Sequence, residues 1–215
     1  MTFIAWDIET CPIPIERMTE AQRARFQKEL KRQLARTPDM SEDTAGKLVR
    51  SVHPMLGWIC CISAVRGTEE DHGQPRTWTA DTIEDESSML MQFWNDVKPF
   101  KGITWVTFNG KRFDVPFLLA RSVHYRLTPT RNDLLQTYPY RHHPHLDLMT
   151  VWPQSYSLND LCDHLCVPSP KSDMDGSHVA DAVSMGRIDD VATYCAADVT
   201  ATLACVQAMP ILSTL

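Results

Sequence analysis

Two carboxylates stand one residue apart near the start of the chain, in the sequence FIAWDIETCP at residues 3–12. Residues 2–8 are mainly apolar and predict a buried strand. Because side chains two residues apart in a strand lie on one face, we expect Asp7 and Glu9 to converge beyond the strand end. Two such carboxylates repel unless a proton or a cation such as Mg²⁺ lies between them. A pair of solvated acids is the alternative for so short a motif.

Two more acids follow elements that could present them to the same point. In TFNGKRFDVPFLL an apolar strand over 102–110 ends near Asn109, and Asp114 opens a helix, either as its N-cap or as a ligand at the sheet edge. In YCAAD, Tyr194 and Asp198 are four residues apart and therefore share a helix face. A tyrosine hydroxyl beside a metal-bound carboxylate can orient or deprotonate a water. Taken alone, the pair is equally a packed tyrosine and a surface acid.

The elements that position these residues alternate between strand and helix in the first half of the chain. Charged residues interleaved with apolar ones at helical spacing predict an amphipathic helix over 19–36. Two strands separated by a turn predict a hairpin. We therefore expect an α/β fold with a mixed central sheet flanked by helices. The remaining expected elements are helices near 41–48, 89–97, 114–124, 157–165 and 189–207, and hairpin strands at 57–67 and 75–80.

Length and composition indicate one intracellular domain. At 215 residues and 43% apolar composition the chain can bury one core, so we expect a single domain over 1–215. No apolar run approaches a membrane span, and the early acids interrupt any signal peptide. Seven cysteines without CxxC pairs fit a reducing compartment, so we expect a cytoplasmic location. A net charge of −6 argues against nucleic-acid binding by bulk electrostatics alone.

Charge is unevenly spread along the chain. Residues 16–36 carry seven Lys and Arg against three Glu, whereas residues 133–215 carry ten Asp against three Lys and Arg. We interpret 15–50 as a basic helical insertion between the first and second strands. It is either a guide for single-stranded nucleic acid, combining cations with an exposed aromatic side chain, or a buttress of the sheet.

The motifs together resemble a known family. The order D-x-E, N-x-x-x-F-D and Y-x-x-x-D is similar to the DEDD 3′–5′ exonucleases of the ribonuclease-H-like superfamily, in their tyrosine (DEDDy) branch. More narrowly, DIET, FNGKRFDVPFL, HLDLM, SLNDLC, DMDGSHV and YCAADVTAT resemble the PolB-like predicted exonucleases. The resemblance spans residues 3–206 and implies a ribonuclease-H-like fold.

The resemblance also implies a catalytic site with two Mg²⁺ or Mn²⁺ ions. Asp7 would bridge both ions, with Glu9 and Asp198 on the first. Asp114 would serve the second ion, partly through water, and Tyr194 would position the attacking water. Ions about 3.5 to 4 Å apart stabilise both the attacking and the leaving oxygens of an in-line displacement. The product would be a nucleoside 5′-monophosphate released from a 3′ end.

Substrate contacts are implied by position in the same motifs. Thr10 and the backbone of Ile8 would contact the terminal 3′ hydroxyl, and Asn109 would lie near the scissile bond. Phe113 would be a core residue or a base-stacking one. Lys171 lies in the stretch that resembles the family's substrate-side loop.

Several functions remain open on the sequence alone. We favour a metal-dependent exonuclease on single-stranded DNA or unpaired 3′ ends. The same metal chemistry also serves RNA, so an exoribonuclease is the nearest alternative. An inactive nucleic-acid-binding module would not require all five motif side chains. An endonuclease of ribonuclease H type would place its last acid differently and lack the tyrosine.

Other polar residues are interpreted as structural. His142, His143 and His145 lie in a proline-containing loop, and we interpret them as surface residues rather than a metal site. DMDG at 173–176 lacks the glutamate that a calcium loop requires. We expect Asp147, in HLDL, to make a structural hydrogen bond.

Overall fold

A five-stranded sheet forms the centre of the computed structural model, which describes residues 1–152, 154–170 and 174–210. In the sheet the order is β3-β2-β1-β4-β5, so the first strand of the chain is the central one. β2 is antiparallel to both of its neighbours, β3 and β1, whereas β1, β4 and β5 are parallel to one another. The expected mixed sheet is confirmed. Its strands are β1 (Phe3–Pro12), β2 (Gly57–Gly67), β3 (Arg76–Thr79), β4 (Thr104–Thr107) and β5 (His145–Asp147).

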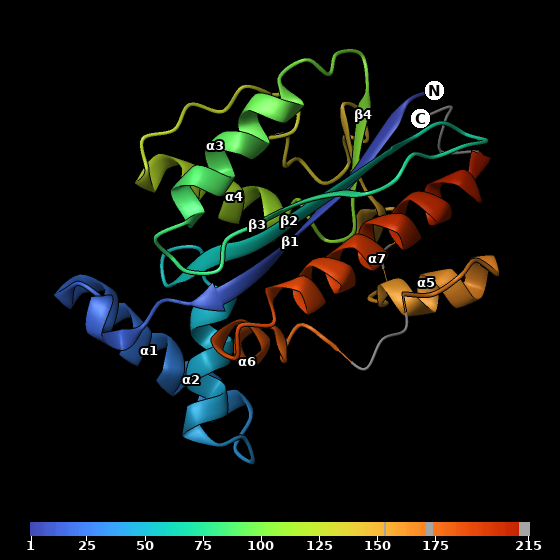
Figure 1. Ribbon diagram of the computed structural model, residues 1–215. Coiled ribbons are helices and arrows are strands. Elements are labelled where there is room, and N and C mark those ends of the chain that lie inside the picture. Colours follow the sequence, from blue (N-terminus) through green and yellow to red (C-terminus); the bar gives the residue numbers. More distant parts are fainter. Residues whose placement is uncertain (153, 171–173, 211–215) are drawn as a thin grey trace.

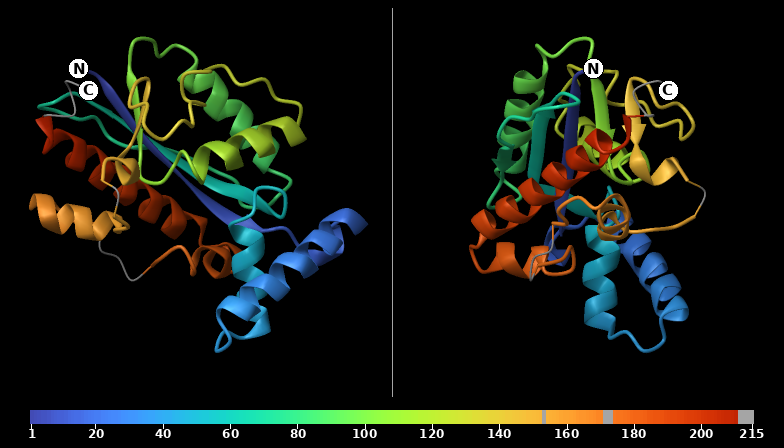
Figure 2. Two further views of the ribbon diagram at one scale, coloured as in Figure 1. Left: turned by 180° about the vertical axis from the view of Figure 1, so that it is seen from behind. Right: turned by 90° about the vertical axis from the view of Figure 1, so that its right-hand side faces the viewer.

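Helices cover both faces of this sheet. Figure 1 shows α3 and α4 over one face and α7 with α5 over the other, and Figure 2 shows α1 and α2 as a hairpin that projects from one end. Two single-turn 3₁₀ helices lie at Ile15–Arg17 and Leu148–Thr150. The α-helices of the described residues are α1 (Glu20–Arg36), α2 (Glu42–Ser51), α3 (Glu86–Val97), α4 (Asp114–His124), α5 (Leu158–Leu165), α6 (Val179–Ser184) and α7 (Ile188–Gln207).

Successive side chains of β1 point to opposite faces of the sheet, where two separate apolar clusters lie, and this alternation sets the direction of Asp7 and Glu9. Trp6 and Ile8 belong to an apolar cluster with residues of α3 and α4, whereas Ala5 belongs to a second cluster with residues of α7. Side chains two apart in a strand share a face, so Asp7 and Glu9 continue the row of Ala5. The two carboxylates therefore face α7.

The first strand is longer than predicted. β1 runs to Pro12, so Asp7 and Glu9 lie within the strand rather than beyond its end, and that expectation was wrong. The strand continues because residues 10–12 pair with β2, after a register shift between Glu9 and Thr10. Pro12 is tolerated because it ends the ladder, opposite Gly57.

Two short elements were not predicted. β5 has three residues and pairs in parallel with β4, and α6 has six residues and no side-chain cap. Such short segments lack a period that sequence alone can reveal. The long helices were predicted well, since Thr19 and Ser157 both form capping boxes at the expected starts of α1 and α5.

The basic insertion is helical, as expected, but its aromatic residue is not exposed. Phe26 is 5% exposed, and the guanidinium of Arg50 lies 5.3 Å from its ring centroid. Arg50 also donates to the carbonyl of Ile13 at 3.0 Å. Lys47 of α2 pairs with Asp181 of α6 at 3.2 Å. These contacts attach the hairpin to the sheet end, and 15–50 offers no stacking side chain to a base.

No helix in the described ranges is long and apolar enough to cross a membrane.

Candidate active site

At the candidate site, the carboxylate of Asp114 accepts a hydrogen bond from β1 where the pairing of β1 with β4 has ended. β4 pairs with β1 only over Phe3–Ala5. Further along β1, the N–H of Ile8 donates to Oδ1 of Asp114 at 3.0 Å. Asp114 is 1% exposed and is the first residue of α4, whose N-cap is Phe113. Asp114 is therefore not the N-cap of α4, and its carboxylate faces β1.

The turn before α4 is held by another buried carboxylate. Asp147, at the end of β5, accepts hydrogen bonds from the N–H groups of Asn109 at 2.8 Å, Lys111 at 2.9 Å and Met149 at 3.1 Å. Its expected structural role is confirmed. Because three N–H donors satisfy it, Asp147 fixes the turn that delivers Asp114.

The same turn depends on a close backbone approach at Gly110. A Cβ at this position would lie 2.4 Å from Cβ of Thr107, which leaves no room for a larger residue. The preceding residue, Asn109, has φ of 68°, a left-handed conformation that asparagine tolerates better than most side chains. The N-G pair thus permits the sharp change of direction between β4 and α4.

Helix α7 supplies the remaining residues of the site. Tyr194 and Asp198 lie one turn apart on this helix, and both side chains line the same cavity. Between them, Cys195 places its Sγ 3.7 Å from Oδ2 of Asp7. Cys195 was not singled out from the sequence, and this contact was not predicted. The only signal was its position on the helix face that Asp198 shares.

One cavity collects the predicted catalytic residues. Its volume is about 240 Å³, and Asp7, Glu9, Asp114, Tyr194 and Asp198 all line it. The structure thus brings together four carboxylates from three distant segments. Their catalytic roles remain predictions.

The predicted substrate residues are more dispersed. Ile8, Asn109 and Phe113 line the same cavity. Thr10 lines an adjacent cavity of about 550 Å³ between α2 and α6, and its hydroxyl already donates to the carbonyl of Ser51 at 2.8 Å. The backbone N–H of Ile8 is likewise occupied by Asp114. Lys171 lies outside the described residues.

Burial and mutual repulsion raise the pKa values of the carboxylates. Burial is the main cause for Asp7 and Glu9, and the charges of neighbouring carboxylates push both pKa values further above their usual range. Burial raises the pKa of Asp114 to about 7 and that of Asp198 to about 6. Four carboxylates at this spacing cannot all be charged at neutral pH without a counter-ion.

The residues present fit a divalent metal. Oxygen atoms of Asp7 and Glu9 and Sγ of Cys195 lie within 4.8 Å of one another. Burial raises the pKa of the Cys195 thiol well above its usual range, so the thiol stays protonated and is a poor ligand. Carboxylate oxygens that need a counter-ion are the donor set of hard cations such as Mg²⁺ and Mn²⁺. Asp7, Glu9, Asp114 and Asp198 are the side chains that would hold them.

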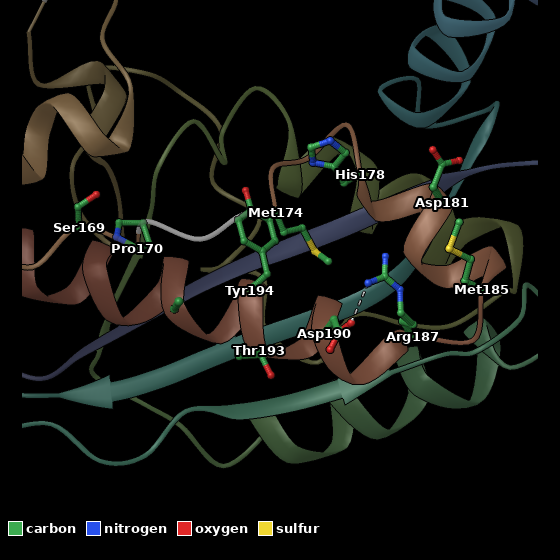
Figure 3. Close-up of a pocket in the computed structure, with 11 residues that line it drawn as sticks. Ser169, Pro170, Met174, His178, Asp181, Met185, Arg187, Asp190, Thr193 and Tyr194 are labelled. Atoms are coloured by element: carbon green, nitrogen blue, oxygen red, sulfur yellow. Dashed lines mark ion pairs between the residues drawn. The ribbon is translucent and has the colours of Figure 1, made fainter.

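Tyr194 lines both the carboxylate cavity and a larger cavity of about 800 Å³. Figure 3 shows its ring reaching from α7 toward Met174. Burial, followed by the charges of Asp198, Glu9 and Asp7, raises the pKa of the hydroxyl far above its usual range. Tyr194 is therefore a protonated donor at neutral pH.

The interpretation of the three histidines as surface residues was wrong in one case. His145 is fully buried in β5, where Nε2 lies 2.9 Å from Oγ1 of Thr107 and Nδ1 lies 3.1 Å from the carbonyl of Gln136. His143 is exposed and His142 is half-buried. His145 thus joins β5 to β4.

Comparisons with known structures show the same fold. A family B DNA polymerase from the hyperthermophilic archaeon Pyrobaculum calidifontis superposes with a TM-score of 0.62 and 18% identity, over 94% of this chain and 23% of that one. Product-bound exonuclease I superposes with a TM-score of 0.52 and 15% identity, over 98% of this chain and 44% of that one. The zinc-bound E. coli ExoI–ssDNA complex superposes with a TM-score of 0.51 and 16% identity, over 98% of this chain and 42% of that one. This chain therefore spans less than half the length of each, and the fold is that of a ribonuclease-H-like exonuclease domain.

The family follows from the sequence match. Residues 52–209 match the model of the predicted 3′–5′ exonucleases related to the exonuclease domain of PolB, and the chain belongs to that family. The predicted enzyme class, 3′–5′ exonuclease, is confirmed. The match includes Asp114, Tyr194 and Asp198, whereas Asp7 and Glu9 lie before it. No curated protein matches the chain.

Proposed function

We propose that this chain removes nucleoside 5′-monophosphates from the 3′ end of single-stranded DNA, or from unpaired 3′ termini, in a reaction that requires two Mg²⁺ or Mn²⁺ ions. The observation that carries the proposal is the single cavity lined by four carboxylates and Tyr194, in a member of a 3′–5′ exonuclease family. A solved neighbour, the E. coli ExoI–ssDNA complex, contains single-stranded DNA and supports that substrate class.

The carboxylates have separate tasks in this proposal. Asp7, Glu9 and Asp198 would hold the first ion, and Asp7 and Asp114 would hold the second. When bound, the ions supply the positive charge that stabilises the attacking and leaving oxygens of an in-line displacement. They also let an acidic cavity accept a phosphodiester that the carboxylates alone would repel.

Tyr194 orients the water instead of removing its proton. Its hydroxyl carries its own proton at neutral pH, and its side chain lines the cavity beside the four carboxylates, so it can donate to a water held there. The attacking water forms the new bond to phosphorus, and the 3′ oxygen of the penultimate nucleotide leaves and takes up a proton.

A direct test compares DNA and RNA strands of one sequence, each labelled at the 5′ end, with Mg²⁺, with Mn²⁺ and with EDTA. We expect a ladder of products shortened from the 3′ end, only when metal is present. Asp7→Asn and Asp198→Asn should lower the rate by about 100-fold or more, as for other lost preorganised electrostatic contacts. Asp189→Asn, which changes an exposed acid on the same helix, is the matched control.

The outcomes separate the alternatives. Shortening of RNA faster than DNA would replace the DNA proposal with an exoribonuclease. Binding of either strand without cleavage would indicate a nucleic-acid-binding module and overturn the proposal.

A further inference from the structure

A second cavity adjoins the active site on the side of the turn before α4. Its volume is about 440 Å³, and it shares Asn109 and Met149 with the carboxylate cavity. Arg112, Tyr140 and Trp152 also line it, and we call it the aromatic groove. None of these three residues has a role in the catalytic cluster.

The aromatic side chains of this groove are open to solvent. Tyr140 is 76% exposed and Trp152 is 39% exposed. Trp152 also lines a further cavity of about 310 Å³ with Tyr156 and His164, so the path continues beyond the groove. Single exposed apolar residues are common, but two large rings along one path from a catalytic site form a surface on which successive bases can stack.

The fixed positive charge in the groove belongs to Arg112. Its side chain is exposed, and its guanidinium is paired with no carboxylate in the described parts of the chain. His142 also lines the groove, but burial and then the charge of Lys111 lower its pKa, so it is neutral at neutral pH. An unpaired guanidinium beside exposed rings suits a phosphate backbone that carries bases.

The loop that carries Tyr140 is fixed by hydrogen bonds from the buried side chain of Lys111. Lys111 is 3% exposed, and its ammonium donates to the carbonyls of Tyr138 at 2.9 Å, Pro139 at 3.5 Å and Arg141 at 2.6 Å. The hydroxyl of Thr150 also donates to the Pro139 carbonyl, at 3.1 Å. A loop fixed by hydrogen bonds to carbonyls on both sides of Tyr140 presents its ring with little loss of conformational entropy on binding.

We propose that the aromatic groove binds the nucleotides upstream of the scissile bond in a single-stranded substrate, with Tyr140 and Trp152 stacking on bases and Arg112 contacting a phosphate. The proposal rests on the proposed exonuclease function. The groove continues along the surface past Trp152, as a continuing strand requires. The basic insertion, in contrast, buries its aromatic residue Phe26 and offers cations without a stacking surface.

The test measures binding and cleavage separately. EDTA removes the metal that hydrolysis requires, so binding can be measured without cleavage. Under this condition, fluorescence anisotropy reports the affinity for an oligo-dT of about 12 nucleotides, a length within the usual range of single-strand binding sites. We expect Tyr140→Ala and Trp152→Ala each to weaken binding by about 5-fold or more, the scale of one lost stacking contact. Arg112→Ala should reduce the slope of log affinity against log salt by about 0.7.

Cleavage of a dinucleotide provides the second readout. In this proposal a dinucleotide occupies only the part of the groove beside Asn109 and Met149, so Trp152→Ala should cleave it at the wild-type rate while KM for the longer strand rises. Met91→Ala and Arg36→Ala, which change exposed residues on α3 and α1, are the controls. Trp152→Phe and Tyr140→Phe keep a ring and should restore binding, which excludes misfolding as the cause.

The two proposals fail in different ways. Unchanged affinity and salt dependence in all three alanine variants would overturn the groove, whatever the cleavage results. Wild-type protein that binds oligo-dT through the groove but cleaves nothing would overturn the exonuclease function and leave the groove standing.

Discussion

The backbone N–H of Ile8 and the carboxylate of Asp114 are joined by a hydrogen bond of 3.0 Å, although the two residues lie 106 positions apart. The bond stands where a β4 partner would otherwise continue the ladder, since β4 pairs with β1 only as far as Ala5. Asp114 therefore has two tasks, because it satisfies a buried backbone donor and adds a charge to the site.

Two substitutions separate these tasks of Asp114. Asp114→Asn keeps an oxygen that can accept from Ile8 and removes the charge, so we expect loss of nuclease activity with little change in melting temperature. Asp114→Ala also leaves a buried N–H unpaired, at a cost of about 1–3 kcal/mol. For a chain of this size, that lowers the melting temperature by several degrees.

Thermal denaturation and the cleavage assay measure the two effects on the same samples. Asp190→Asn, at an exposed acid on α7, is the control. Equal melting temperatures for the Asn and Ala variants would contradict the structural task of this carboxylate.

The stabilising effect of a bound metal on the folded protein should increase with pH. Burial raises the pKa of Asp114 from 3.8 to about 7, so between these values the folded protein holds a proton that the unfolded chain has released. The contribution of Asp114 to the stability of the metal-free protein should therefore fall as pH rises through this window. Mg²⁺ or Mn²⁺ competes with these protons, so its stabilising effect should be larger at pH 8 than at pH 5.

Another buried group contributes with the opposite sign. Burial lowers the pKa of His145 to about 3, so unfolding takes up a proton below pH 6.5 and stability rises with pH there. The measurement is therefore the difference in melting temperature between wild type and Asp7→Asn across pH 5 to 8, with and without metal. A metal effect of equal size at both ends would contradict the carboxylate cluster as the binding site.

Gly110→Ala tests the turn that presents Asp114. The new Cβ would lie 2.4 Å from Cβ of Thr107, so the turn must shift. Overpacking of this kind costs about 1–3 kcal/mol, and we expect a lower melting temperature together with lower activity. Gly176→Ala adds the same methyl where no atom lies within 4 Å, and it should leave both quantities unchanged. A Gly110→Ala protein with wild-type turnover would show that the turn does not position the carboxylate.

Lys111→Met tests the support beneath the aromatic groove. The substitution removes the ammonium that holds the carbonyls of residues 138, 139 and 141, and the loop should become mobile. We expect affinity for a long single strand to fall more than the cleavage rate of a dinucleotide. Lys101→Met, at an exposed lysine, is the matched control. Equal losses on both substrates would place the effect in the catalytic site.

The sequence was informative wherever a local pattern determines structure. The capping residues Thr19 and Ser157 and the apolar faces of the long helices placed those helices correctly, and strand alternation placed Asp7 and Glu9 on one face. The three-residue strand that contains His145 has no such pattern. It exists because Asp147 and His145 bond to partners far along the chain, which a local reading cannot anticipate.

The residues of the sequence motifs that line the site were predicted, whereas the contacts of two of its side chains were not. Asp114 was left between two interpretations, because only the fold shows that its partner is the backbone of β1. Cys195 was missed because a helix face of apolar residues is ordinarily core. The contact with Asp7 depends on how closely α7 approaches β1, which spacing along one helix does not determine.

The central position of β1 has a consequence for the newly made chain. This strand leaves the ribosome before its partners β2 and β4, which follow about 50 and 100 residues later, and Asp198 follows Asp7 by about 190. At about 5–20 residues per second, synthesis of that interval takes roughly 10 to 40 seconds. During this time the acids have no shared cavity. The nuclease site can therefore form only after α7 has emerged, and a nascent chain cannot cut nucleic acid before then.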